Sequence, residues 1–320
     1  MPPRRSTARK TPPKSKAARG YFDLQVNGFA GVDFQQPDLS ARQLAQAVAA
    51  LHAHGTDRIL LTLITDSIAQ LCIKLARIEG ILRRHPTLAR TIVGYHLEGP
   101  YLLPERGYCG AHEPKWMHAP DIAEFEQLWV ASGGRIRLMT LAPEWPGSPA
   151  FIRQLVARGV RIAIGHSNAS ADEIDAAVTA GLSLCTHLGN GVPLQLDRHD
   201  NIVQRLLARD ELYAAFIPDG IHLPPHVLRN FVRAKPPDKV LFTTDAMAAA
   251  GAGPGRYRIA HLVTEVGADG IVRQPGETRY FAGSSLTMDK AAANVAAMTG
   301  WTAAQARSAC SARIAKYLGC

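Results

Sequence analysis

Four side chains that could carry out hydrolytic chemistry each follow a short apolar run of this sequence. Glu98 lies in HLEGP, His166 in GHSN, His187 in THLGN and Asp245 in TTDA. One carboxylate and two imidazoles are typical ligands of a catalytic divalent metal ion that keeps a coordination position open. Such an ion lowers the pKa of a bound water towards about 7, and a nearby carboxylate can accept the proton and pass it to a leaving amine. The residue types therefore predict metal-assisted hydrolysis with Asp245 as acid and base.

A single buried histidine or aspartate at a strand end is more often a hydrogen-bonded structural group than a ligand. Here five of the eight expected strands end next to a Glu, His or Asp, and a sixth ends in Gln25 and Asn27. Because they recur at one end of successive strands, we interpret these residues as parts of one site.

The elements that must position these residues follow a repeating strand–helix pattern. Helical patterns separate eight short apolar runs, and eight such units in about 300 residues predict a (β/α)8 barrel of the TIM type. An open, doubly wound sheet is the alternative. The expected strands are Tyr21–Val26, Arg58–Leu63, Thr91–Leu97, Arg135–Leu141, Val160–Ile164, Leu182–Thr186, Leu212–Ile217 and Lys239–Thr244. The expected helices are Ser40–His54, Ser67–Arg84, Asp121–Ser132, Pro149–Arg158, Ala171–Ala180, Pro224–Ala234 and two that begin at Thr287 and Thr302, after a hairpin over Leu262–Phe281.

The charge of the chain is concentrated at its N-terminus. The 320 residues carry a net charge of +9, but residues 1–19 hold seven basic and no acidic residues, which leaves 29 basic and 27 acidic residues for the rest. We expect a basic, disordered tail over 1–19 and one hydrolase barrel over 20–320. No apolar run approaches the ~20 residues of a membrane helix. Neither a membrane nor a nucleic acid is an expected partner, and five cysteines without a CxxC pair indicate reduced thiols in the cytoplasm.

Several strings of the sequence match a known family in order. LQVNGFAGVDF, GYHLEGPYL, GHSNAS, THLGN, PDGIH, TTDAMAAAG and FAGSSLTMD resemble N-acetylglucosamine-6-phosphate deacetylases of the amidohydrolase superfamily, from Tyr21 to the end of the chain. The resemblance implies hydrolysis of the N-acetyl group of N-acetylglucosamine 6-phosphate to glucosamine 6-phosphate and acetate. Two alternatives stay open: deacetylation of another N-acyl amino sugar or N-acyl compound, and a degenerate, non-catalytic sugar-phosphate binder.

The resemblance also implies a role for each matching position. Glu98, His166 and His187 fall on the ligands of one divalent metal ion, with zinc favoured over iron or manganese, and Asp245 falls on the catalytic acid and base. His222 falls on a residue that contacts the substrate and helps polarise its carbonyl. The positions implied to contact an amino sugar phosphate are Ala111, His112, Asn190, Gly191, Arg198, Asp219, Gly220, Ile221, His222, Phe281, Ala282 and Gly283, with Arg198 on the phosphate.

Two departures from the family pattern affect these expectations. Gln25 and Asn27 stand where the superfamily usually has His-x-His, which predicts one metal ion rather than two. His52 and His54 also read His-x-His, but residues i and i+2 of a helix do not share a face. The small β-sandwich that usually flanks the barrel is reduced or absent, so the chain is either a barrel-only variant or the product of a truncated gene. A homodimer remains possible.

Overall fold

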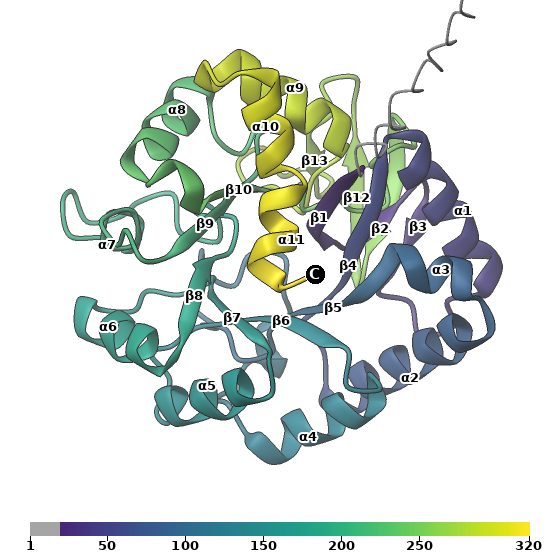
Figure 1. Cartoon of the computed structure of the whole chain (residues 1–320), viewed down its shortest axis with the longest axis horizontal. Helices are drawn as coiled ribbons and strands as arrows, with labels where there is room; N and C mark the ends of the chain where they lie inside the picture. The colour runs from purple at the N-terminus through teal and green to yellow at the C-terminus, as the bar shows by residue number, and fades with distance from the viewer. Residues whose placement is uncertain (1–19) are drawn as a thin grey trace, which may run out of the picture.

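Eight parallel strands follow one another around a barrel in chain order (Figure 1). This arrangement is seen in a computed structural model that describes residues 20–320, so the expected tail over 1–19 lies outside the described residues. The barrel strands are β1 (Tyr21–Val26), β4 (Thr56–Ile64), β5 (Ile92–Glu98), β6 (Ile136–Leu141), β7 (Arg161–Ile164), β8 (Leu182–Cys185), β9 (Tyr213–Phe216) and β10 (Val240–Phe242). The predicted (β/α)8 barrel is confirmed, because an open doubly wound sheet would reverse its strand order.

A main-chain hydrogen bond and the side chain of Asp23 connect the first strand of the barrel to the segment after its last strand. The Asn27 N–H donates to the carbonyl of Ala246 at 2.7 Å, just beyond β10. The buried carboxylate of Asp23 in β1 accepts hydrogen bonds from the hydroxyls of Thr243 and Thr244 and from the Thr244 N–H. Asp23 thereby joins β1 to the backbone that immediately precedes Asp245.

Helices surround the barrel, and most were predicted within a few residues. They are α1 (Ala41–Ala53), α2 (Ile68–Arg84), α3 (Pro86–Thr91), α4 (Ile122–Ala131), α5 (Ser148–Ala157), α6 (Ala171–Ala180), α7 (Ile202–Leu207), α8 (Pro225–Ala234), α9 (Met288–Thr299), α10 (Ala303–Ala309) and α11 (Ala312–Leu318), with two 3₁₀ helices, η1 (Pro114–Trp116) and η2 (Pro237–Lys239). Ser40, Ser170 and Thr302 form capping boxes at α1, α6 and α10. The short helices α3 and α7 were not predicted, and the single last helix expected from Thr302 is divided into α10 and α11. No helix within residues 20–320 has the length and apolarity to cross a membrane.

The segment between β10 and α9 forms a small antiparallel sheet rather than a simple hairpin. Its strands are β11 (Gly255–Ile259), β12 (Leu262–Val266) and β13 (Val272–Arg273). The hairpin predicted over Leu262–Phe281 contains β12 and β13, but β11 pairs with β12 from a stretch that the sequence did not mark as a strand. Across residues 20–320, the other antiparallel pairing is the two-residue pair β2 (Gly28–Phe29) and β3 (Val32–Asp33).

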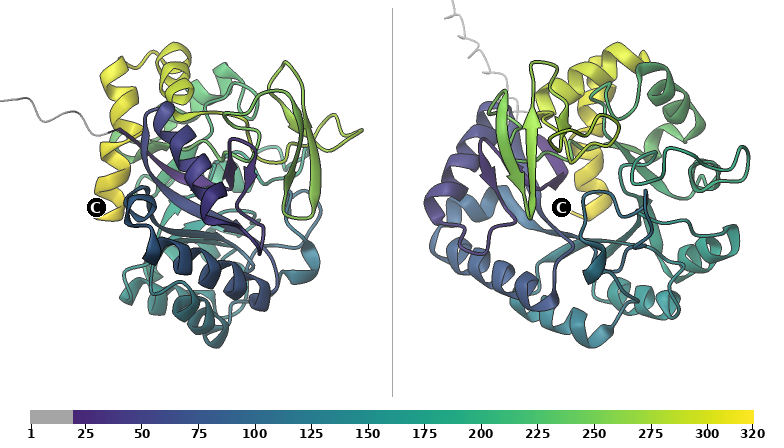
Figure 2. Two further views of the ribbon diagram at one scale, coloured as in Figure 1. Left: turned by 90° about the vertical axis from the view of Figure 1, so that its right-hand side faces the viewer. Right: turned by 180° about the vertical axis from the view of Figure 1, so that it is seen from behind.

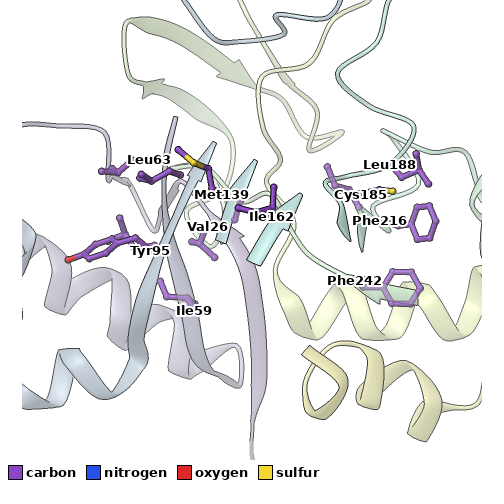
Figure 3. Close-up of a cluster of buried hydrophobic side chains, with 14 of the residues drawn as sticks. Val26, Ile59, Leu63, Tyr95, Met139, Ile162, Cys185, Leu188, Phe216 and Phe242 are labelled. Carbon is purple, nitrogen blue, oxygen red and sulfur yellow. The ribbon is translucent and has the colours of Figure 1, made fainter. Parts of the chain in front are cut away.

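Apolar side chains pack on both sides of the barrel wall. Outward-facing residues of the strands meet the surrounding helices in one large cluster, part of which Figure 3 shows around Tyr95, Met139 and Phe216. A second cluster joins one residue from most strands, including Phe22 and Leu241, to α11. Helix α11 lies over the barrel axis in Figure 1 and on the opposite side of the molecule from β11 and β12 in Figure 2 (left). It therefore closes the end of the barrel away from the small sheet.

Because α11 closes the barrel, Ile314→Ala should destabilise the fold. The Ile314 side chain is fully buried in the second cluster, so its truncation leaves a cavity that costs about 2–5 kcal/mol in the free energy of unfolding. Urea unfolding measures this change, with Val130→Ala as the matched control, since Val130 is 77% exposed. A loss below about 1 kcal/mol, or an equal loss in the control, would contradict the role of α11.

Candidate active site

Three of the four candidate side chains meet in one buried cluster at the carboxyl ends of the strands. Glu98 ends β5, while His166 and His187 lie just beyond β7 and β8. Glu98 Oε1 lies 3.3 Å from His166 Nε2 and 2.8 Å from His187 Nε2. One ligand atom from each residue lies within 4.8 Å of the others, and all three residues are buried. The spacing allows the three side chains to share one metal ion.

Neighbouring groups fix the protonation of the His166 ring. His166 Nδ1 lies 2.6 Å from the carbonyl oxygen of Tyr108, which can only accept, so Nδ1 carries a proton. The lone pair of the neutral ring is then on Nε2, which faces the Glu98 carboxylate. A backbone carbonyl behind a ligating imidazole is a usual support of metal sites. His166 Nε2 and the Glu98 carboxylate therefore both present lone pairs to the same buried site, which suits a divalent cation with nitrogen and oxygen ligands.

The two carboxylates of the site have pKa values shifted in opposite directions. Burial favours the neutral form of Glu98, but hydrogen bonds with His166 and His187 hold its pKa well below the usual value. Burial, together with the charge of Glu98, raises the pKa of Asp245 to about 7. Two carboxylates whose pKa values differ in this way are suited to separate tasks, one as a fixed anion and the other as a group that exchanges a proton.

The residues that carry these side chains adopt an unusual backbone conformation. His166, His187 and Asp245 have φ angles of 53°, 27° and 51°, in the left-handed region that residues other than glycine rarely occupy. Each costs on the order of 1 kcal/mol and persists where the surrounding structure determines it. The strand ends therefore turn sharply where each side chain is presented to the site.

The cluster forms one wall of a pocket of about 270 Å³. Asp245 and Asn27 line it beside the three candidate ligands, and His222 lines it with Phe281, the two rings lying 5.1 Å apart edge to face. Asn27 Nδ2 donates to Asp245 Oδ1 at 2.7 Å. The pocket thus joins a candidate metal centre, a half-buried carboxylate with a raised pKa and a further histidine.

Comparisons with known proteins agree with this arrangement. No protein-family model matches the chain. N-acetylglucosamine-6-phosphate deacetylase of Bos taurus is 32% identical over 310 residues, which cover 94% of this chain and 74% of the relative. The chain belongs to the N-acetylglucosamine-6-phosphate deacetylase family.

Two further relatives place the chain within this family. The structure of N-acetyl-D-glucosamine-6-phosphate deacetylase from Mycobacterium smegmatis, solved in complex with N-acetyl-D-glucosamine-6-phosphate, superimposes with a TM-score of 0.85 at 31% identity. The match covers 98% of this chain and 82% of that structure. N-acetylgalactosamine-6-phosphate deacetylase of Escherichia coli O157:H7 is also 32% identical, over 93% of this chain and 77% of the relative. The deacetylase fold is therefore common to relatives named for two different amino sugar phosphates.

Most of the substrate positions implied by the deacetylase resemblance line the pocket. They are Ala111, His112, Asn190, Gly191, His222, Phe281 and Gly283. His112 is also close to the candidate metal ligands: its Nε2 lies 3.7 Å from Glu98 Oε2, and its Nδ1 lies 2.9 Å from the hydroxyl of Thr65. Burial lowers the pKa of His112 to about 3, so this ring is neutral.

Five of the implied positions do not line the pocket. They are Arg198, Asp219, Gly220, Ile221 and Ala282. Asp219 instead binds His222: its Oδ2 lies 2.6 Å from Nδ1 of the ring, and its Oδ1 accepts the N–H of His222. Arg198 is exposed, outside the pocket lining.

The sequence analysis missed several residues that line the pocket. Arg279 and Tyr280 lie directly before Phe281, and Leu194 follows the predicted segment after β8. Arg279 is the single Lys or Arg among the lining residues that the structure describes. Its position next to the string FAGSSLTMD was a signal that could have identified it.

The His-x-His pair at the end of α1 does not line the pocket. His52 Nε2 lies 2.8 Å from the hydroxyl of Thr91, whereas His54 Nδ1 pairs with Asp289 at 3.1 Å. The two rings therefore have different partners, in agreement with the expectation from helix geometry.

Proposed function

We propose that this chain hydrolyses the N-acetyl group of N-acetylglucosamine 6-phosphate and releases acetate and glucosamine 6-phosphate. Family membership supports the reaction class. The observation that carries the proposal is the meeting of Glu98, His166, His187 and Asp245 in a single pocket. A degenerate, non-catalytic binder would have no need for this complete set of reactive groups.

The proposed cofactor is one divalent metal ion, with zinc favoured and iron(II) or manganese(II) as alternatives. Glu98, His166 and His187 would hold it, and their mixed oxygen and nitrogen donors suit all three ions. When bound, such an ion polarises the amide carbonyl and makes a water molecule acidic at neutral pH.

Residues of the chain itself perform the proton transfers in the proposed mechanism. Ionised Asp245 accepts a proton from the attacking water and then donates it to the amide nitrogen as the C–N bond breaks. The products are acetate and a free amine. Asp219 orients His222 through Nδ1, which leaves the opposite ring nitrogen, Nε2, to contact the substrate beside its carbonyl group.

Two arginines are candidates for the substrate phosphate. Arg198 holds the position implied by the family, while Arg279 lines the pocket. An arginine suits a phosphate because its charged guanidinium donates two parallel hydrogen bonds.

The proposed activity is tested by acetate release from purified, zinc-loaded chain. We expect turnover of N-acetylglucosamine 6-phosphate and a much higher KM for unphosphorylated N-acetylglucosamine. N-acetylgalactosamine 6-phosphate is the third substrate, because relatives of equal identity carry both names. Faster turnover of the galacto epimer would reassign the sugar, and no acetate from any of the three would favour the non-catalytic alternative.

The phosphate contact is tested by comparing Arg198→Ala with Arg279→Ala. Replacing the arginine that binds phosphate should raise KM for the phosphorylated sugar by about 10- to 100-fold, since a hydrogen bond to a charged group contributes ~1.5–3 kcal/mol. The same substitution should leave the unphosphorylated sugar unaffected. Unchanged KM values in both variants would refute an arginine contact.

A cytoplasmic enzyme that forms a homodimer is the proposed cellular form. All five cysteines are unpaired, as a reducing compartment would require. Size-exclusion chromatography with light scattering tests the dimer, and a monomeric mass at micromolar concentration would contradict it.

A further inference from the structure

Two carboxamides at the end of β1 each hold one carboxylate of the pocket. Gln25 Nε2 donates to Glu98 Oε2 at 3.0 Å, and Asn27 Nδ2 donates to Asp245 Oδ1 at 2.7 Å. Both carboxamides are buried. We propose that they are positioning residues with separate tasks: Gln25 sets the affinity for the cation through Glu98, and Asn27 sets the rate of proton transfer through Asp245.

A local irregularity of β1 makes this double contact possible. The register between β1 and β4 shifts between Asp23 and Val26, where β1 has one extra residue. Successive side chains of a regular strand point to opposite faces, but a bulge redirects them. In a regular strand the adjacent side chains of Leu24 and Gln25 would point to opposite faces. Here Leu24 packs in the apolar cluster with α11, and Gln25 can still reach Glu98 in the pocket.

The backbone beyond the bulge is also fixed. The Asn27 N–H donates to the carbonyl of Ala246, and the Asn27 carbonyl accepts from the N–H of Phe34 at 3.0 Å. The side chain of Asn27 therefore extends from a main chain that is held on both sides. Because this main chain is held, the Asn27 carboxamide has little freedom to follow movements of Asp245, and it can therefore orient that side chain.

Gln25 determines which oxygen of Glu98 faces the imidazoles. The terminal torsion of a glutamate is broad, so an unsupported carboxylate can rotate. Gln25 occupies Oε2, which leaves Oε1 to face His166 and His187. The next nearest donor to Oε2, Nε2 of His112, is 3.7 Å away, longer than a hydrogen bond. Gln25 thus supplies the contact that fixes this ligand.

Asn27 acts in the same way on the second carboxylate. Its amide presents the NH₂ group to ionised Asp245, because the reverse orientation would place the amide oxygen 2.7 Å from a carboxylate oxygen with no proton between them. With Oδ1 of Asp245 occupied, proton exchange falls to Oδ2. A carboxamide does not titrate, so Asn27 orients this carboxylate without competing for its proton.

Substitutions of similar shape that remove the donors test the two tasks separately. Gln25→Met should weaken zinc binding by about 10- to 100-fold, the usual effect of losing a group that supports a ligand, measured by competition with a chelator. Asn27→Leu should keep zinc affinity within about twofold but lower kcat for N-acetylglucosamine 6-phosphate by about 10²-fold, with little change in KM.

A third carboxamide provides the control. Gln35 is equally buried, but its side chain binds main chain and neither carboxylate: it accepts from the N–H of Ile64 and donates to the carbonyls of Thr62, at 2.9 Å, and Asn27, at 3.3 Å. Gln35→Met removes these main-chain contacts but no contact with a carboxylate, so it should lower the melting temperature, keep zinc affinity near wild type and reduce kcat far less than Asn27→Leu does. The two positioning roles together predict that Gln25→Met loses zinc affinity, whereas Asn27→Leu loses kcat and keeps its zinc affinity.

The inference rests on the proposed function, but its failure can be recognised separately. Equal losses in Gln25→Met and Asn27→Leu, or a lower melting temperature with wild-type zinc affinity and kcat, would overturn it even in an active enzyme. Zinc affinity decides the role of Gln25 without any turnover. A wild-type chain that binds zinc but releases no acetate would refute the proposed function and the role of Asn27 together.

Discussion

Asp245→Asn should reduce turnover by about 10³- to 10⁴-fold while the chain still binds its metal ion. Asparagine has nearly the same shape, but it can neither accept the proton of the attacking water nor deliver one to the leaving amine. Asp245 is half-buried beside Asn27, and the proposed mechanism gives both proton transfers to this one group. The measurement is kcat for acetate release together with the zinc content of the purified variant.

An aspartate outside the pocket, Asp33, supplies the control for this experiment. Burial raises the pKa of Asp33 to about 6, so it resembles Asp245 in its environment, but it lies outside the catalytic pocket. Asp33→Asn should leave kcat within a few-fold of wild type. Wild-type turnover in Asp245→Asn, or an equally large loss in both variants, would remove Asp245 from its proposed role.

The barrel could be predicted from the sequence because its strands are buried on both faces. Runs such as Ile136–Leu141 are almost continuously apolar, a pattern typical of strands covered by helices. The helices were predictable where capping residues mark their starts, as Ser170 does for α6. α7 has six residues, too few for a clear helical period. β11, with its exposed and charged surface, carries little apolar signal, and both elements were missed.

Only part of the candidate site could likewise be predicted from the local sequence, because the rest depends on contacts between segments that are distant along the chain. Glu98, His166, His187 and Asp245 could be singled out because each follows an apolar run, and the carboxyl ends of barrel strands meet at one rim. Contacts between loops follow no such rule. The pairing of Asp219 with His222, and the presence of Arg279 in the pocket, depend on the paths of loops whose sequences carry no periodic signal.

The left-handed backbone at the ligands is a further feature that the sequence does not reveal. Glycine adopts such φ angles most readily, and Asn, Asp and His are enriched there among the other residues, so the types of His166 and His187 permit this backbone without predicting it. The surrounding barrel determines the turn at these positions.

Glu98→Gln should abolish both zinc binding and the stabilisation that zinc confers. Glu98 Oε1 is the point on which His166 and His187 converge, and a neutral amide is a poor ligand for zinc-like ions. Zinc at 100 times its dissociation constant stabilises a folded chain by about 2.7 kcal/mol. Wild type should therefore melt several degrees higher with zinc than with a chelator, and Glu98→Gln should show no difference.

Another buried glutamate separates this effect from general destabilisation. Glu79 is buried and accepts hydrogen bonds from Tyr95 and Arg135, outside the pocket that the candidate ligands line. Glu79→Gln weakens a buried network, so its melting temperature should fall, but the increase caused by zinc should equal that of wild type. A zinc-dependent increase that survives in Glu98→Gln would show that the ion binds elsewhere, and the assignment of the three ligands would be wrong.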